Sequence, residues 1–380
     1  MAGIYIHIPF CKKACHYCDF HFSTNLKYRD EMLDAILLEI ILQKTYLANQ
    51  TIETIYFGGG TPSLFSGSDL SRIIGAVNEN YNVSENAEIT LEANPDDLFP
   101  QKIKEIRQTD INRFSIGIQS FFDDDLKWMN RAHLASESES AIKRAQDYGF
   151  PNLNIDLIYG FPLLSEEKWR TNLQKATDFE VADLSSYALT VEPKTALAAF
   201  INTKKQEPMD EEQSAAHFNI MLDTLCEVGY QHYEISNFSL PEMQSKHNTN
   251  YWKGIHYLGI GPSAHSFNGT SRQWNVADNN RYLSALAKKE TPTTTEFLTI
   301  VNRANEYIMT SLRTMWGIEL NKFSSDFGKD ALQYLEQQSI SYINKGYITR
   351  SDDTIALTRN GKLYADGIAA DMFLEENFKF

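Results

Sequence analysis

The sequence predicts an α/β protein: a partial (β/α)6 TIM-like barrel followed by a C-terminal helical, winged-helix-like domain. Strand-like runs alternate with segments that carry apolar residues at helical spacing, which indicates a parallel sheet with right-handed crossovers. Glycine-rich and polar residues follow several of these runs, and parallel α/β folds bind their ligands at that edge of the sheet. We therefore expect the functional site at the carboxyl ends of the strands.

The expected barrel elements follow one another without a long gap. Strands are expected at 3–8, 51–57, 87–95, 113–119, 153–160 and 183–189, and helices at 28–47, 69–81, 97–108, 137–148 and 166–178. Periodicity alone does not separate a curved sheet from an open doubly wound one. The preference for a barrel rests partly on the family resemblance described below.

The chain divides into three predicted regions. Residues 1–236 form the barrel, 237–290 an aromatic and histidine-rich connecting segment, and 291–380 the C-terminal domain. In the last region we expect helices at 299–315 and 329–345, a hairpin around Ser351-Asp352-Asp353 and a closing helix. The polar stretch 202–213 is expected to be a surface loop.

Composition limits the classes of function. The 380 residues have a net charge of −15 and 42% hydrophobic content, which predicts a globular protein that does not bind nucleic acid. No secretory signal is evident, and the apolar stretch 35–42 is too short to span a bilayer. We expect a cytoplasmic protein, with transient association with a membrane left open. Cys226, in a predicted amphipathic helix, is expected to be a buried structural thiol.

Three cysteines lie close together after the first strand, at Cys-x-x-x-Cys-x-x-Cys spacing: Cys11, Cys15 and Cys18. Three thiolates can hold three irons of a four-iron cluster and leave the fourth iron open to another ligand. The alternative is a structural zinc site completed by His7, His16 or His21. The absence of a second cysteine pair favours the cluster.

The stretch from Tyr5 to Phe20 resembles the radical S-adenosylmethionine superfamily. Within it, the stretch is similar to the oxygen-independent coproporphyrinogen dehydrogenases and to their relatives, the HemW haem chaperones. The resemblance implies a 4Fe-4S cluster whose open iron is chelated by the amino and carboxylate groups of S-adenosylmethionine (SAM). It also implies that the Gly-rich turn with Gly59, Gly60 and Thr61 contacts the methionyl part of this cofactor.

Further candidate SAM residues follow from the same resemblance. The residues that match the family position by position are Glu92, Gln119, Arg131 and Asp156, and those that match more loosely are Tyr5, Tyr17 and Ala188. An arginine offers a two-pronged donor to a carboxylate, a glutamate can hold an ammonium group, and Gln119 and Asp156 can bind ribose hydroxyls. Without the resemblance, each would equally well be an ordinary polar residue at a strand end.

The segment His247-Asn-Thr-Asn-Tyr-Trp252 matches the His-Asn-x-x-Tyr-Trp motif of the HemW family, in which the histidine binds haem iron. Imidazole is a normal axial ligand of haem, and aromatic rings can pack on the porphyrin. The alternative is that His247 is a hydrogen-bonded histidine in an aromatic core.

The resemblance leaves two classes of protein: a chaperone that binds haem, and a dehydrogenase that decarboxylates coproporphyrinogen III. Three features of the sequence separate them. The dehydrogenases carry a fourth cysteine where this chain has Phe20, and they have an N-terminal extension, whereas here ten residues precede Cys11. The His247 motif belongs to the chaperones. We expect a haem chaperone without an assigned catalytic residue that serves respiratory haem proteins, some of them in membranes. A homodimer is suggested by the resemblance alone, and a radical enzyme acting on an unrelated substrate is the third alternative.

Overall fold

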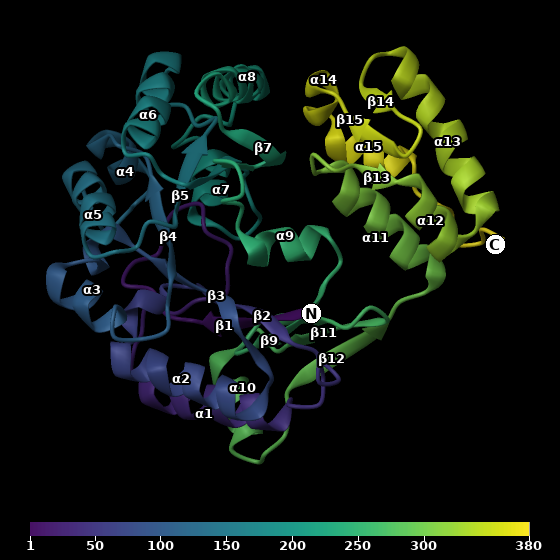
Figure 1. The fold of residues 1–380 in the computed structure, drawn as a ribbon. Coiled ribbons are helices and arrows are strands. Elements are labelled where there is room, and N and C mark those ends of the chain that lie inside the picture. Colours follow the sequence, from purple (N-terminus) through teal and green to yellow (C-terminus); the bar gives the residue numbers. More distant parts are fainter. Residues whose placement is uncertain (380) are drawn as a thin grey trace.

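The computed structural model describes residues 1–379. Six parallel strands form the barrel part of the chain, which Figure 1 shows on the side away from the C-terminal domain. They are hydrogen-bonded in chain order: β1 (Ala2–Ile8), β2 (Ile52–Gly59), β3 (Val83–Ala93), β4 (Arg113–Gln119), β5 (Leu153–Tyr159) and β6 (Asp183–Ala188). Every pairing among them is parallel. The predicted six-stranded partial barrel is confirmed.

Helices connect these strands and form the outer layer in Figure 1. They are α1 (Arg29–Leu42), α2 (Gly67–Asn80), α3 (Pro100–Ile106), α4 (Asp123–Trp128), α5 (Ala135–Asp147) and α6 (Glu166–Asp178), with short 3-10 turns η1 (Pro62–Leu64) and η2 (Pro95–Asp97). Side-chain caps set some of their starts: the hydroxyls of Ser66 and Ser165 accept backbone N–H groups of α2 and α6. Bounds agree with the expected ones within a few residues, except that the first helix ends at Leu42.

Side chains of the barrel strands alternate between two environments. On β2, Ile55 and Phe57 belong to the apolar core, whereas Thr54 and Tyr56 hydrogen-bond to polar residues of the barrel interior. This is the two-residue period of a strand with one face toward the helices. The barrel interior is therefore polar, and it is the interior that carries the candidate site.

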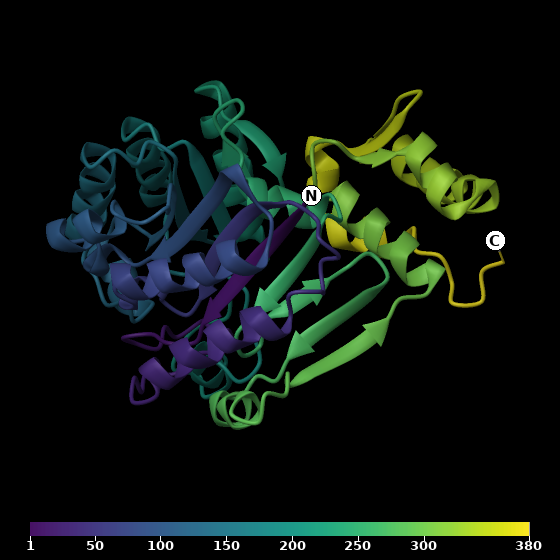
Figure 2. The ribbon, with the colours of Figure 1, turned by 60° about the horizontal axis from the view of Figure 1, so that its bottom comes forward.

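The sheet continues beyond the barrel on both sides to twelve strands. Strand β9 (His256–Ile260) pairs parallel to β1 and is followed by the antiparallel strands β10 (His265–Phe267), β11 (Ser271–Asn275) and β12 (Thr293–Phe297). On the other side, β8 (Asn237–Ser239) and β7 (Gln231–Glu234) pair antiparallel beyond β6. Figure 2 shows the green strands of the connecting segment continuing this sheet. None of these short strands was predicted.

Four more helices belong to this part of the chain: α7 (Ala196–Asn202), α8 (Glu211–Glu227), α9 (Lys246–Trp252) and α10 (Asn279–Leu286). In Figure 1, α9 lies at the centre of the molecule, between the barrel strands and the C-terminal domain. Cys226 on α8 is exposed, so the prediction of a buried thiol is wrong. The apolar face of α8 is formed by residues such as Phe218, Met221 and Leu225, and Cys226 lies outside it.

The C-terminal domain has an apolar core of its own. Its elements are α11 (Ile300–Leu312), β13 (Ile318–Glu319), α12 (Leu320–Phe327), α13 (Lys329–Asn344), β14 (Ile348–Arg350), β15 (Thr354–Leu357), α14 (Arg359–Lys362) and α15 (Ala365–Asp371). Strands β13, β15 and β14 form a small antiparallel sheet that includes the predicted hairpin. Arg313 joins this domain to the barrel side through an ion pair with Glu234 at 3.1 Å. Within residues 1–379, no helix combines the length and apolar character needed to cross a bilayer.

Candidate cluster and cofactor site

The three cysteines of the predicted cluster lie in the loop between β1 and α1, where each is a free, partly exposed thiol. Backbone hydrogen bonds fix the loop: Cys11 N–H donates to Ser23 O at 3.0 Å within it, and His16 N–H donates to Met129 O, just after α4, at 3.1 Å. All three thiols line one cleft of about 1750 Å³. The loop thus presents its cysteines to a single cavity.

Each of the loop histidines that a zinc site would need forms a hydrogen bond through at least one ring nitrogen. Nε2 of His7 hydrogen-bonds to His21 O at 2.9 Å, and Nδ1 of His16 to Trp128 O at 2.9 Å. Nε2 of His21 hydrogen-bonds to Oδ1 of Asn279 at 2.7 Å. His7 is hydrogen-bonded at both ring nitrogens, since its Nδ1 also lies 3.3 Å from Oη of Tyr5. His16 and His21 each keep one ring nitrogen for a metal, so these contacts exclude neither the cluster nor the zinc site.

Almost all of the predicted SAM residues line the same cleft as the cysteines. They are Tyr17, Gly59, Gly60, Thr61, Glu92, Gln119, Arg131, Asp156 and Ala188. Tyr5 lies behind them, where its ring stacks on that of Tyr56 with centroids 6.1 Å apart. Residues from five strands, β2 to β6, and from three loops are thereby brought to one cleft, as the parallel topology requires.

The glycine-rich turn after β2 has no room for side chains. A Cβ atom on Gly60 would lie 2.5 Å from the carbonyl oxygen of Phe10, and Gly59 has a φ of +101°. Thr61 N–H donates to the same Phe10 carbonyl at 2.6 Å. The turn therefore packs directly against the start of the cysteine loop, and only glycine fits its closest approach.

Arg131 is held rigidly at the side of the cysteine loop. Its Nη2 donates to Oδ1 of Asn94 and to Gly117 O, both at 2.7 Å, and its Nη1 lies 3.4 Å from Sγ of Cys15. The buried Nε has no partner among the described residues. A carboxylate of a bound cofactor would satisfy this free donor, so Arg131 fits the predicted role.

Glu92 on β3 and Asp156 on β5 form an acidic pair on the two strands that flank β4. Burial, reinforced by the charge of Asp156, raises the pKa of Glu92 to about 7. Burial also raises the pKa of Asp156 to about 6, although a hydrogen bond from Asn154 opposes this. Such an acidic site favours a ligand with a positively charged or hydrogen-bond-donating group.

The remaining site residues bear on cluster assembly and on backbone shape. Burial raises the pKa of Cys18 to about 12 and also raises the pKa of Cys11, so metal binding must displace thiol protons.

Gln119 ends β4 in a left-handed conformation, with a φ of +68°, which only a few per cent of non-glycine residues adopt. Such outliers cluster at functional sites.

His247 is not in the cleft lining; it is buried inside the barrel near the N-terminal ends of β1 and β2. Its Nδ1 hydrogen-bonds to Oγ1 of Thr54 at 2.8 Å and its Nε2 to Oη of Tyr251 at 2.9 Å. Its backbone N–H donates to Oε1 of Glu88 at 3.1 Å. Burial lowers the pKa of His247 to about 3, so the imidazole is neutral. In this arrangement both ring nitrogens are hydrogen-bonded, as in the alternative of an aromatic-core histidine.

Sequence reasoning missed several residues that support the site. Tyr56 donates to Oε1 of Glu92 at 2.9 Å, and Asn94 and Gly117 hold Arg131. A Cβ on Gly117 would lie 3.0 Å from the Arg131 guanidinium, so the glycine makes room for it. The available signal was the run of polar residues and glycine at every second position of β2 and β4, which marks the interior face.

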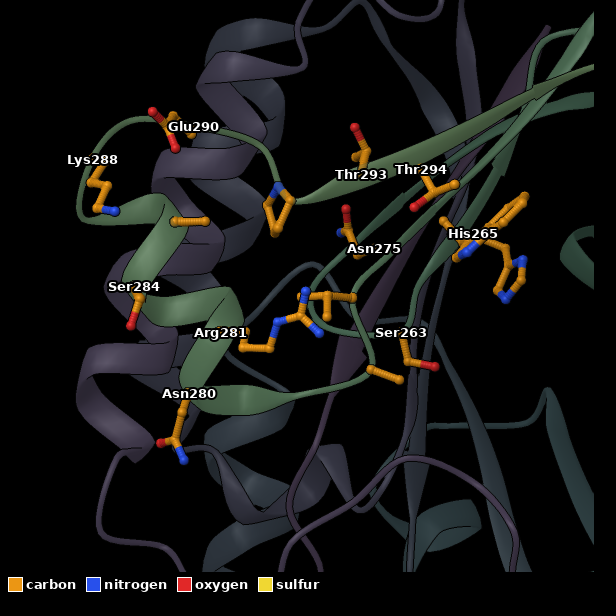
Figure 3. A pocket seen from close by; sticks show the side chains of 15 residues that line it. Ser263, His265, Asn275, Asn280, Arg281, Ser284, Lys288, Glu290, Thr293 and Thr294 are labelled. Carbon is orange, nitrogen blue, oxygen red and sulfur yellow. The ribbon is translucent and has the colours of Figure 1, made fainter.

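A second cavity, of about 820 Å³, lies between α10 and strands β11 and β12 (Figure 3). Figure 3 shows Arg281, Lys288 and His265 around it. None of the predicted site residues lines this cavity. Apart from Tyr5 and His247, the predicted site residues line the cleft at the barrel mouth.

The fold and the cysteine loop define a radical SAM protein. The Radical SAM superfamily model matches residues 5–176, and the HemN C-terminal domain model matches residues 298–364. The chain is 32% identical over 371 residues to the "Heme chaperone HemW" of Bacillus subtilis, covering 97% of this chain and 98% of that protein. It is 30% identical to the proteins of the same name in Lactococcus lactis (98% and 97% covered) and Escherichia coli (98% and 98% covered).

The chain therefore belongs to the HemW family of radical SAM proteins. Among solved structures, the coproporphyrinogen III oxidase HemN from Escherichia coli superimposes with a TM-score of 0.85, covering 98% of this chain and 90% of that chain. The identity to that enzyme is 22%, so this likeness concerns the fold.

Proposed function

We propose that the protein is a haem chaperone that binds a 4Fe-4S cluster, SAM and haem and delivers haem to respiratory haem proteins. The observation that carries the proposal is Phe20. It stands where the related dehydrogenases have their fourth cysteine, its side chain is 67% exposed, and it lines the cleft. The names of the curated relatives support the same function.

Cys11, Cys15 and Cys18 would hold the cluster, and Arg131, Glu92 and the Gly59–Thr61 turn would hold SAM. The three thiols, the unpartnered Nε of Arg131 and the backbone-only surface of Gly60 fit these groups. When bound, the cluster and SAM supply one-electron chemistry. The chain's own contribution is to orient the cofactor's amino and carboxylate groups and to keep them out of bulk water.

The cleft also suits a porphyrin. Its volume of about 1750 Å³ exceeds the roughly 300–1,000 Å³ of ordinary ligand pockets, which leaves room for a second ligand beside SAM. Its apolar lining includes the rings of Tyr17, Phe22, Tyr187, Phe218 and Tyr364. Within residues 1–379 Lys362 forms no ion pair; its Nζ donates to Nδ1 of His232 at 2.8 Å. This cation is suited to a haem propionate.

His247 is the proposed iron ligand, with one structural requirement. Because its Nε2 is bonded to Tyr251, α9 must shift before the ring can reach iron. Helix α9 is only seven residues long, and Glu88 accepts the backbone N–H groups of Lys246 and His247 at its start. The proposed acceptor is a respiratory haem protein, in some cases membrane-bound, and a homodimer remains part of the proposal.

The test is an anaerobic assay of the cluster-reconstituted protein with coproporphyrinogen III, SAM and a reductant, beside a haem titration. We expect no protoporphyrinogen and a haem spectrum that depends on His247. His265→Ala is the matched control, because that histidine is exposed on β10, outside the barrel interior. Product formation at a catalytic rate would make the protein a coproporphyrinogen dehydrogenase. Equal haem titrations of wild type and His247→Ala would remove His247 as the ligand.

A further inference from the structure

Three side chains, His247, Tyr56 and Glu92, follow one another through the barrel interior from α9 to the cofactor cleft. On β2, Thr54 and Tyr56 are two residues apart and share the interior face. Tyr56 lies opposite Thr90 of β3, and Glu92 follows two residues later on the same face. His247 contacts Thr54 at one end of this series, and Glu92 lines the cleft at the other.

The three side chains are held by direct contacts. The ring of His247 stacks on that of Tyr56, with centroids 4.9 Å apart and planes inclined by 23°. The hydroxyl of Tyr56 donates to Oε1 of Glu92 at 2.9 Å. The phenol ring of Tyr56 is therefore placed between the two, with one ring face covered by His247 and its hydroxyl on the carboxylate.

Gly58 and Tyr5 are the other close neighbours of Tyr56. A Cβ added to Gly58 would lie 2.9 Å from the ring of Tyr5 and 3.0 Å from both Tyr56 and Glu92, so only a glycine leaves room for these side chains. The ring of Tyr5 stacks on Tyr56 with centroids 6.1 Å apart, farther than the 4.9 Å of the His247 ring. The shorter ring contact of the phenol is therefore the one with His247.

We propose that His247 is a positioning residue of the SAM site: its ring holds Tyr56, and Tyr56 holds the Glu92 carboxylate in the orientation that receives the amino group of SAM. This role belongs to the arrangement of α9 seen here and is separate from iron ligation. The inference rests on the proposed placement of SAM beside Glu92. It predicts that the shape of the imidazole matters for SAM affinity, whereas its nitrogens do not.

The experiment measures the SAM dissociation constant of the cluster-reconstituted protein by anaerobic equilibrium dialysis at pH 8. Three substitutions at one position separate the ring from its nitrogens: His247→Phe keeps a ring against Tyr56, whereas His247→Gln and His247→Ala do not. We expect His247→Ala and His247→Gln to bind SAM about 3- to 10-fold more weakly, the size of one aromatic stacking contact. His247→Phe should restore wild-type affinity although it cannot ligate iron.

Two further variants show which step fails if the expectation is not met. Tyr56→Phe deletes only the hydroxyl on Glu92 and should weaken SAM binding as His247→Ala does. Tyr251→Phe removes the partner of Nε2 but leaves the stack, and it should bind SAM normally. A purely structural role of His247 would lower the melting temperature of all three His247 variants without separating Phe from Gln.

The outcomes distinguish the inference from the proposed function. Weaker SAM binding in Glu92→Gln and Tyr56→Phe, with wild-type affinity in His247→Ala, would overturn the positioning role and leave the SAM site standing. Equal loss in His247→Phe and His247→Gln would also overturn it. Unchanged SAM affinity in Glu92→Gln would overturn the placement of SAM itself, and the inference with it.

Discussion

The ionisation of Glu92 should control SAM binding between pH 6 and pH 8. Burial and the neighbouring charge of Asp156 raise the pKa of the Glu92 carboxyl to about 7 in the free protein. The carboxylate form, which holds the cofactor's amino group, is therefore lost as the pH falls through that value. SAM affinity is expected to be highest at pH 8 and to fall toward pH 6.

The size of the effect follows from the pKa of the free protein. A single group with a pKa of about 7 weakens binding by about tenfold between pH 8 and pH 6 when only the ionised form binds, and by about threefold when the neutral form binds about fivefold more weakly. Asp156, whose pKa is raised to about 6, adds about a further twofold over the same range. Glu92→Gln keeps an acceptor for Tyr56 but exchanges a charged hydrogen bond for a neutral one, which costs about 1 kcal/mol, or about fivefold, at pH 8.

The assay is the SAM dissociation constant measured anaerobically at half-unit steps from pH 6 to pH 8. Iron content and melting temperature, recorded at each pH, show whether the cluster and the fold are intact. Any dependence of the SAM dissociation constant on pH that remains in Glu92→Gln is due to the amino group of SAM and to Asp156. Parallel profiles for wild type and Glu92→Gln would refute the assignment of Glu92 as the titrating group.

Three other expectations concern the cluster, the barrel interior and the glycine-rich turn. After reconstitution, the alanine variants of Cys11, Cys15 and Cys18 should lose bound iron. The control Cys226→Ala, which changes an exposed thiol, should retain it. Equal iron content in all four variants would refute the assignment of the three cysteines as cluster ligands. Asp183→Asn removes the carboxylate that pairs with the buried Arg113 at 2.5 Å and leaves Glu88 as the negative charge near that arginine, which should cost about 3 kcal/mol in thermal unfolding. The control Asp124→Asn breaks an exposed pair and should change stability by less than about 1 kcal/mol. Gly60→Ala places a Cβ 2.5 Å from a carbonyl oxygen and should abolish SAM binding, whereas Gly75→Ala, with open space around it, should bind SAM normally.

The parallel core of the fold could be predicted because its signals are local. Strands β1 to β5 carry apolar residues at every second position or nearly so, and a helical pattern follows each of them, and such alternation has one common solution. Strands β7 to β12 are only three to five residues long and lie in an aromatic, turn-rich segment. Their pairing depends on the barrel edges already being in place, which no local pattern records.

The cleft residues of the candidate site were predictable for a similar reason, since parallel strands end at a common edge. The position of His247 was not. The motif shows which side chain is present, but the partners of its two nitrogens, Thr54 and Tyr251, are fixed only by tertiary packing. Tyr56 was missed because a tyrosine within a strand is usually an ordinary core residue, and its contact with Glu92 joins two different strands.

Because the imidazole of His247 stacks on Tyr56, the binding of haem by His247 and the binding of SAM beside Glu92 depend on the same side chain. A haem that draws His247 away from Tyr56 removes the support of Glu92, so haem bound in this way would weaken SAM binding. Thermodynamic reciprocity then requires SAM to weaken haem binding by the same factor. Loading with SAM and loading with haem would be antagonistic states of one barrel, and the release of one ligand would favour the capture of the other.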